Sequence, residues 1–222
     1  MGKKFIIGDI HGCHQELLAL LHRINPDPKS DTVIFLGDYV DRGPQAREVI
    51  EELIKLRQRF PQMITLMGNH EQALLQFLEG RERDFYLVIG GRETLMSYGI
   101  IEPSVESALT NMPKEHITFL KGLLPYWEDA DYIYVHAGLQ PGVPLVQQST
   151  EWLFWANGGR FVTVFHDFGK PVIFGHLASR TPIIESNKIG IDTGAVYGGS
   201  LSCLVLPDLE IISVPGKKYW SM

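Results

Sequence analysis

The sequence predicts an α/β fold, a four-layer α/β/β/α sandwich in which two β-sheets pack face to face between outer helices. Three observations favour this fold. A short apolar run followed by a residue able to bind metal occurs five times. Strand and helix patterns alternate up to Asn69, whereas strand patterns dominate after His136. Between these parts lies a mostly helical stretch, residues 71–124, which we expect to form a helical insertion.

Each of the five apolar runs is short and nearly continuous, and most of them end in glycine. The runs are Phe5–Ile7, Val33–Leu36, Ile64–Met67, Tyr132–Val135 and Val172–Phe174. Such runs are typical of strands buried on both faces, and glycine lets the chain turn sharply where a strand ends. We therefore expect the five strand ends to converge.

Helical patterns connect the first three runs. Gln15–Ile24 and Arg47–Phe60 each carry an apolar face at helical spacing. The resulting strand–helix order predicts parallel strands for this half of the chain. The later strand patterns predict a second, antiparallel sheet. Its strands are expected at residues 183–184, 188–192, 201–206 and 211–214.

The composition indicates an ordinary soluble globular protein, with 45% hydrophobic and 21% charged residues. At 222 residues, the chain is long enough to bury one sizeable core, so we expect a single domain over residues 1–222. The apolar runs are far shorter than the roughly 20 residues of a membrane helix. The first residues carry no signal-peptide pattern. We expect a cytoplasmic monomer without a membrane partner.

Charge and cysteine usage exclude further classes of protein. The net charge of −6 lacks the positive field that draws proteins onto nucleic acid, so we expect no nucleic-acid partner. Cys13 and Cys203 are far apart and form no CxxC pair. Neither a disulfide framework nor a thiolate metal site is therefore predicted.

Six residues at or near the ends of the apolar runs offer oxygen or nitrogen donors to a metal. They are Asp9, His11, Asp38, Asn69, His136 and His176. A donor set without cysteine suits manganese, iron or zinc. Six donors exceed what one ion needs, whereas two ions about 3.5–4 Å apart fit the number and are typical of phosphoryl-transfer sites. We expect two divalent ions, Mn²⁺ before iron or zinc, with Asp38 as the bridging ligand.

Three neighbouring residues complete a candidate catalytic set. Arg42 offers a planar fork of donors that matches phosphate oxygens, and it supplies positive charge to an acidic chain. His70 directly follows Asn69, and with Asp41 to orient it we expect it to protonate the leaving oxygen.

These residues lie in segments that resemble the signature motifs of the phosphoprotein phosphatase family, within the calcineurin-like metallophosphoesterases. The segments are Gly8–Gly12, Gly37–Gly43 and Gly68–Glu71, and His136–Gly138 and Gly175–His176 match the later metal histidines of the family. All five motifs occur in order over most of the chain. The compact length is similar to that of bacterial and phage serine/threonine protein phosphatases, and related motifs occur in symmetrical diadenosine tetraphosphate hydrolases.

The resemblance implies two metal sites that share one ligand. One site has Asp9, His11 and Asp38, and the other has Asp38, Asn69, His136 and His176. It also implies in-line attack on phosphorus by a metal-bridging hydroxide, with phosphate bound by Arg42 and protonation by His70 and Asp41.

The chain departs from the family pattern beside Trp155. The family has a second phosphate-binding arginine just after this tryptophan, but Ala156 stands here. Arg160 is a candidate for that role from a shifted position. Tyr197 is a candidate for lining the substrate cleft, with a core position as the alternative.

Several polar residues have simpler expected roles. Four histidines match no motif position, so we expect them at the surface or at helix caps; they are His14, His22, His116 and His166. Asp192 is expected to be a structural turn residue. Glu71 is expected to support the turn after His70 through hydrogen bonds.

Three functions fit these motifs. The first is a serine/threonine protein phosphatase that acts on a phosphoprotein. The second is symmetrical cleavage of diadenosine tetraphosphate, a phosphorylated small molecule. The third is an inactive phosphate-binding module, against which the intact metal, acid and Arg42 positions argue. The short chain favours the protein phosphatase, because we expect hydrolases of the second kind to be longer.

Overall fold

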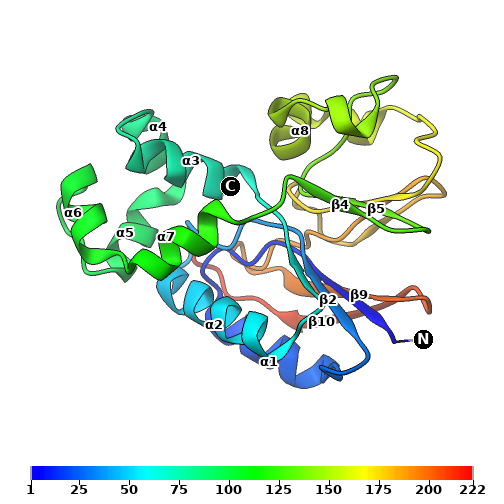
Figure 1. The fold of residues 1–222 in the computed structure, drawn as a ribbon, viewed down its shortest axis with the longest axis horizontal. Helices are drawn as coiled ribbons and strands as arrows, with labels where there is room; N and C mark the ends of the chain where they lie inside the picture. Colours follow the sequence, from blue (N-terminus) through cyan, green and yellow to red (C-terminus); the bar gives the residue numbers. More distant parts are fainter. Residues whose placement is uncertain (1, 222) are drawn as a thin grey trace.

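Two five-stranded mixed β-sheets pack against each other in the computed structural model, with helices on both outer faces (Figure 1). The structure describes residues 2–221, apart from the side chain of Asn157 and the exposure of Gly158. The predicted four-layer α/β/β/α arrangement is confirmed.

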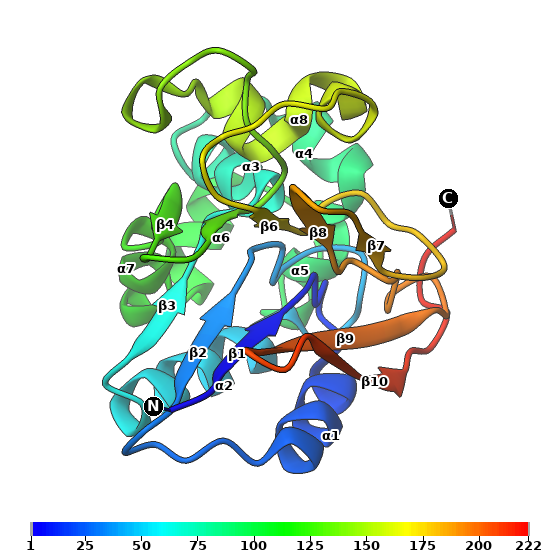
Figure 2. The same ribbon diagram turned by 90° about the vertical axis from the view of Figure 1, so that its right-hand side faces the viewer.

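The first sheet has the strand order β10-β9-β1-β2-β3 (Figure 2). Its strands are β1 (Lys4–Ile7), β2 (Thr32–Phe35), β3 (Met63–Thr65), β9 (Ser200–Leu206) and β10 (Glu210–Pro215). The first three are parallel, as predicted. Placing the C-terminal hairpin β9–β10 in the second sheet was wrong, since β9 pairs antiparallel with β1. This pairing satisfies backbone groups that would otherwise form an open sheet edge.

The second sheet has the order β4-β5-β6-β8-β7. Its strands are β4 (Tyr126–Glu128), β5 (Ile133–Val135), β6 (Val172–Phe174), β7 (Ile183–Ile184) and β8 (Lys188–Gly190). The three central strands are parallel, and only the two edge strands are antiparallel. The expectation of an antiparallel second sheet was therefore wrong for its centre.

One apolar layer joins the two sheets. Ile6, Ile34 and Leu204 lie side by side on the first sheet and face Tyr134 and Ile173 of the second, all at most 1% exposed. Successive residues of a strand point to opposite faces. The alternate residues of β1 and β2 therefore pack against helices instead.

Helices α1 (His14–Ile24) and α2 (Ala46–Arg59) cover the outer face of the first sheet. The outer face of the second sheet is covered by α8 (Thr150–Thr163). A short 3-10 helix, η2 (Leu145–Gln147), precedes α8. Among residues 2–221, we find no helix whose length and apolar character would allow it to cross a bilayer.

A buried lysine holds the end of α8. Lys188 is 2% exposed, and its Nζ donates to the carbonyl oxygens of Phe161, Val162 and Val164 at 3.0–3.2 Å. These carbonyls are the free acceptors of a helix C-terminus, where positive charge is stabilising.

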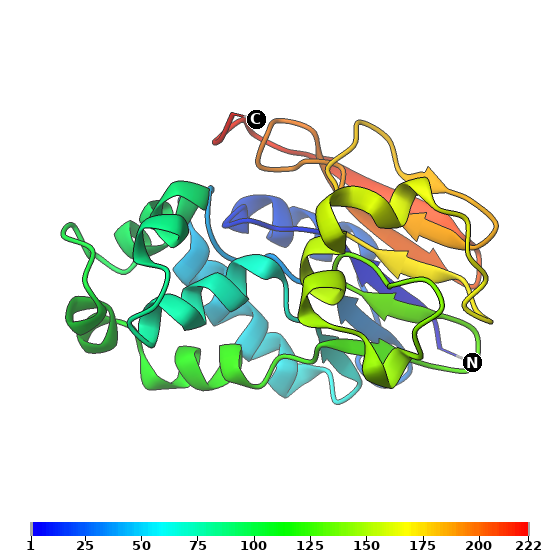
Figure 3. The same cartoon turned by 90° about the horizontal axis from the view of Figure 1, so that it is seen from above.

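The helical insertion predicted at residues 71–124 is confirmed (Figure 3). It consists of α3 (Asn69–Leu78), α4 (Arg83–Tyr86), η1 (Leu87–Gly91), α5 (Arg92–Ser97), α6 (Val105–Asn111) and α7 (Lys114–Lys121). His116 was expected at the surface or at a helix cap, but it is 1% exposed and its Nδ1 lies 2.8 Å from the hydroxyl of Tyr98. This bond joins α5 to α7.

Candidate active site

The six candidate metal ligands come from five loops, each following the C-terminal end of a strand. The loops after β1, β2 and β3 belong to the first sheet, and those after β5 and β6 to the second. The residues are Asp9, His11, Asp38, Asn69, His136 and His176. All are at most 3% exposed except the last, which is partly buried. The predicted convergence of five strand ends is confirmed by the contacts described next.

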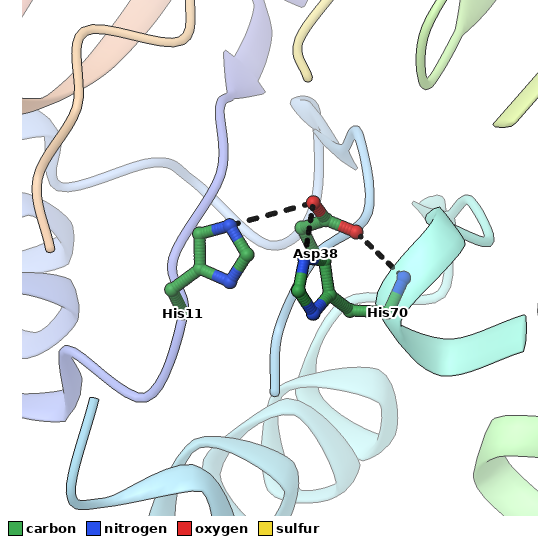
Figure 4. Close-up of side chains that lie close together, drawn as sticks. All are labelled: His11, Asp38 and His70. Atoms are coloured by element: carbon green, nitrogen blue, oxygen red, sulfur yellow. Dashed lines mark hydrogen bonds and ion pairs between the residues drawn. The ribbon is translucent and has the colours of Figure 1, made fainter. Parts of the chain in front are cut away.

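Asp38 lies at the centre of the set. Its Oδ2 is 3.4 Å from Nε2 of His11, and its Oδ1 is 3.4 Å from Nε2 of His136. Figure 4 shows Asp38 between His11 and His70. The two carboxylate oxygens of Asp38 therefore face different histidines.

Nitrogen and oxygen atoms able to bind a metal meet on the His136 side of Asp38. The ring of His136 bonds through Nδ1 to the carbonyl oxygen of Leu36 at 3.0 Å, which makes Nε2 an acceptor. That Nε2 lies 3.1 Å from Oδ1 of Asn69 and 3.2 Å from Nδ1 of His176. Burial is the main cause that lowers the pKa of His136, so its ring is neutral. Converging lone pairs of this kind fit a bound cation.

His11 is oriented in the same way. Its Nδ1 lies 2.9 Å from the carbonyl oxygen of Val40, so the lone pair of Nε2 points into the site. The guanidinium of Arg42 lies 2.7 Å from that Nε2. A positive group therefore already faces this nitrogen, which agrees with a metal-binding role.

Asp9 lies beside a further buried acid. Both of its carboxylate oxygens accept from the backbone N–H of His176, at 3.0 and 3.1 Å. Burial, followed by the charges of Asp192 and Asp38, raises the pKa of Asp9. Asp192 accepts from the N–H of Gly194 in the expected turn, and burial raises its pKa to about 6. Two neighbouring buried carboxyl groups favour a compensating cation.

Glu71 ties two of the loops together. Its carboxylate is fully buried and accepts from the backbone N–H groups of Asp38, Tyr39, Val40 and Gly68 at 2.7–3.1 Å. The sequence predicted that Glu71 supports the turn after His70 through hydrogen bonds. In the structure, its hydrogen bonds also reach the loop after β2. Gly68 must be glycine here, because a Cβ would lie 2.1 Å from Oδ1 of Asp38.

Backbone strain is concentrated in these loops. Five non-glycine site residues have a positive φ between 47° and 70°: His11, Asp38, Asp41, Arg42 and His176. Each such residue costs about 1–3 kcal/mol and persists only where the surroundings hold it. The cross-braces made by Glu71 and by the helical insertion provide this support.

His70 and Asp41 form a buried pair. Nδ1 of His70 lies 2.7 Å from Oδ2 of Asp41, whose Oδ1 accepts from the hydroxyls of Thr94 at 2.6 Å and Tyr86 at 3.1 Å. The other ring nitrogen, Nε2, is buried without a hydrogen-bond partner among the described residues, 4.0 Å from Oδ2 of Asp38. The sequence gave no local signal for Thr94 and Tyr86, which come from the helical insertion.

The electrostatics of this pair favour a mobile proton. Burial raises the pKa of Asp41 to about 7 and lowers the pKa of His70. Both shifts oppose a net charge on the pair. A neutral pair holds one more proton than an ionised Asp41 together with an uncharged His70. This proton is available for transfer.

Arg42 is held by the helical insertion on one side and faces Tyr197 on the other. Its backbone N–H donates to the carbonyl of Gly90 at 3.1 Å, and its guanidinium lies 5.6 Å from the centre of the Tyr197 ring. Gly90 has a φ of 117°, and a Cβ there would lie 2.7 Å from Cγ of Arg42. The partly buried Tyr197 therefore lies beside the site, and Arg42 is positioned to meet an anion.

Arg160 is not brought to the site by any described contact. It lies near the end of α8 with an exposed side chain. Its backbone carbonyl accepts from the hydroxyl of Thr163. Among the described residues, its guanidinium makes no ion pair or hydrogen bond with another predicted site residue.

Comparison with known proteins agrees with this geometry. The sequence model of the calcineurin-like phosphoesterases matches residues 3–200. A protein of Anoxybacillus flavithermus named as an asymmetrical bis(5'-nucleosyl)-tetraphosphatase PrpE is 29% identical, over 95% of this chain and 93% of that protein. A protein of the same name from Bacillus cereus strain Q1 is 30% identical over the same shares. Proteins with this name are therefore of nearly this length, so a short chain does not by itself favour a protein phosphatase.

Solved structures share the fold. The crystal structure of a proposed diadenosine tetraphosphatase superposes with a TM-score of 0.76 at 27% identity, over 97% of this chain and 94% of that chain. A cold-active protein tyrosine phosphatase of a Shewanella species has a TM-score of 0.68 at 19% identity, over 96% and 80% of the two chains. The second likeness extends to the fold alone.

Proposed function

Because this chain belongs to the calcineurin-like phosphoesterases, we propose that it is a metal-dependent hydrolase of bis(5'-nucleosyl) tetraphosphates. Full-length similarity to relatives with that name supports this substrate. The reaction type is supported above all by one observation: nitrogen and oxygen donors meet around Asp38, beside the guanidinium of Arg42.

The proposed ligands are those expected from the sequence. One ion would be held by Asp9, His11 and Asp38, and the other by Asp38, Asn69, His136 and His176. Mn²⁺ suits this oxygen and nitrogen set. Two such ions supply Lewis acidity and lower the pKa of water to about 7.

The protein's own side chains bind and orient the substrate. The guanidinium of Arg42 binds non-bridging oxygens of the reacting phosphoryl group through charge-assisted hydrogen bonds. Nε2 of His70 faces the site and delivers the proton of the His70–Asp41 pair to the leaving oxygen. Glu71 accepts hydrogen bonds from the loops after β2 and β3 and so holds these two loops together. Arg42 and His70 are thereby placed to contact the same phosphoryl group.

The proposed reaction is a hydrolysis. The oxygen of a water forms a bond to phosphorus and gives up a proton to solvent, the phosphoanhydride P–O bond breaks, and the departing phosphate oxygen keeps the electron pair and accepts the proton of the His70–Asp41 pair. We propose asymmetrical cleavage, into a nucleoside triphosphate and a nucleoside monophosphate, following the names of the relatives. The sequence alone favoured a serine/threonine protein phosphatase, with symmetrical cleavage into two nucleoside diphosphates as the alternative.

A serine/threonine protein phosphatase is the second candidate, because the buried His70–Asp41 pair suits a poor leaving group. A phosphoserine alkoxide needs a proton to depart, whereas a nucleoside polyphosphate departs with little help. An acid of this kind therefore has most value on a phosphomonoester.

Parallel assays distinguish the candidates. Manganese-loaded protein is incubated with diadenosine tetraphosphate, a phosphoserine peptide or p-nitrophenyl phosphate, and the nucleotides are separated by anion exchange. We expect the highest kcat/KM on the dinucleotide, with ATP and AMP in equal amounts, and no hydrolysis after chelation until manganese is returned. ADP as the sole product overturns asymmetrical cleavage, and a higher kcat/KM on the peptide favours the phosphatase.

A further inference from the structure

A cavity of about 480 Å³ lies beside the metal donors and belongs to none of the motifs. Two loops form it, residues 178–180 and residues 193–199. Arg180 is the charged residue of its lining, and Tyr197 is the aromatic one. The volume lies within the range of about 300–1,000 Å³ that is usual for small-molecule sites.

The cavity adjoins the reacting position. The loop at residues 178–180 begins two residues after His176. The other loop begins directly after Asp192, the buried acid beside Asp9. The ring of Tyr197, part of the cavity wall, lies 5.6 Å from the guanidinium of Arg42. A molecule whose phosphate meets Arg42 therefore has this cavity next to it.

Arg180 has no protein partner in the described part of the chain. Its side chain is exposed, no carboxylate lies within 4 Å of its guanidinium, and none of the side-chain hydrogen bonds involves it. Two hydroxyls of the lining are already used: Thr193 bonds to the carbonyl of Ser200, and Ser179 to that of Thr181. Arg180 is thus the group left to recognise a charged ligand.

We propose that this cavity binds the nucleotide part of the substrate that lies beyond the reacting phosphorus, with Arg180 paired to its distal phosphates. This assignment rests on the proposed function. A guanidinium matches phosphate oxygens with two parallel hydrogen bonds, and the face of Tyr197 offers a surface for the ribose or the base. The volume of the cavity is larger than a single phosphate requires. In a tetraphosphate, several negatively charged phosphate groups extend beyond the one that Arg42 binds.

Arg180 therefore determines specificity more than rate. A phosphoserine peptide carries its negative charge mainly on the reacting phosphoryl group, which Arg42 and the metal donors already meet. Only a polyphosphate has further phosphate groups that extend from the reacting phosphorus toward the neighbouring cavity. The contribution of Arg180 should accordingly appear in KM for polyphosphates.

The test compares Arg180→Ala and Arg180→Glu with Arg59→Ala. Arg59 is also an exposed arginine, but it ends α2, at the opposite ends of the parallel strands from the site. The readouts are KM for diadenosine tetraphosphate, KM for p-nitrophenyl phosphate, and inhibition of the second reaction by ATP at constant free manganese. For Arg180→Ala we expect KM for the dinucleotide and the inhibition constant of ATP to rise about 10- to 100-fold, as a charged hydrogen bond is lost. Arg180→Glu should raise both further, and Arg59→Ala should change neither.

The outcomes separate this inference from the proposed function. If the dinucleotide is not a substrate of the wild-type protein, the proposed function fails, and the response of ATP inhibition to Arg180 still decides whether the cavity binds nucleotides. If dinucleotide KM and ATP inhibition are the same in Arg180→Ala and Arg59→Ala, the cavity assignment is overturned while the function stands. An equal rise in KM for p-nitrophenyl phosphate also overturns it, because Arg180 would then contact the reacting phosphoryl group.

Discussion

The metal-donor part of the site and the cavity part are built in opposite ways. Around Asp38 the side chains are buried, and backbone groups fix their orientation, as in the bonds of His11 and His136 to carbonyl oxygens. In the cavity, Arg180 is exposed and has no protein partner among the described residues. We propose that the first, rigid part determines which reaction occurs and that the second, open part determines which phosphoester is chosen. Substitutions in the first should abolish chemistry, whereas those in the second should change KM.

The largest effect is expected at the centre of the rigid part. Asp38→Asn removes the charge and one coordinating oxygen of the proposed bridge. Even the supporting partners of metal ligands are worth about 10- to 100-fold in affinity, so we expect at least about 100-fold weaker metal binding together with loss of hydrolysis. Metal content after dialysis and the initial rate measure both. Asp208→Asn, an exposed acid that pairs with Lys3, is the matched control. Full metal occupancy in Asp38→Asn would place the bridge elsewhere.

The next effect concerns His70, which lies in the rigid part but is proposed to move a proton rather than to hold metal. His70→Asn should leave metal content intact and slow phosphoserine peptide hydrolysis by about 10² to 10⁴-fold. The loss on p-nitrophenyl phosphate should be far smaller, because nitrophenolate departs nearly unaided. Equal losses on the two substrates would make His70 a positioning residue. Loss of metal would instead add it to the ligands, as its place beside His11 and Asp38 allows.

Glu71 tests whether the rigid part depends on its cross-brace. A glutamine offers one acceptor oxygen instead of two, so Glu71→Gln leaves two of the four buried N–H donors unpaired. Each unpaired donor costs about 1–3 kcal/mol, and we expect a loss of at least about 2 kcal/mol in the free energy of unfolding. Denaturant titration measures it. Glu79→Gln, an exposed change at the opposite end of the same helix, should stay within about 0.5 kcal/mol. If both variants lose a similarly small free energy of unfolding, the carboxylate of Glu71 does not stabilise these loops as proposed.

The sequence predicted the rigid part because its information is local. A strand, a glycine and a donor are neighbours in the chain, so Asp9, Asp38 and Asn69 were found by pattern alone. The hydrogen bonds that hold the Asp41 carboxylate were not predicted, because their donors Tyr86 and Thr94 lie 45 and 53 residues away along the chain. The sheet membership of β9 was missed for the same reason, since its pairing with β1 joins the two ends of the chain.

The open part shows the limit of matching by motif. The sequence directed attention to Arg160, because it lies a few residues after the family tryptophan. Nothing in the pattern distinguished Arg180 from any other exposed arginine, since its place beside Tyr197 depends on how two separate loops fold together. Cavities of this kind become visible only when residues distant in sequence are placed in space.

The smallest effect is expected at Arg160, and it decides between the two arginines. Arg42→Ala should weaken binding of inorganic phosphate or vanadate by about 10- to 100-fold, because a charge-assisted bond beside the metal donors is lost. Arg160→Ala should change it less than about twofold, as is usual for an exposed side chain without partners in the described structure. Competitive inhibition of p-nitrophenyl phosphate hydrolysis measures both constants. If Arg160→Ala weakens anion binding as strongly as Arg42→Ala, the end of α8 must approach the site when phosphate binds. The open part of the site would then include α8, and not only the loop that carries Arg180.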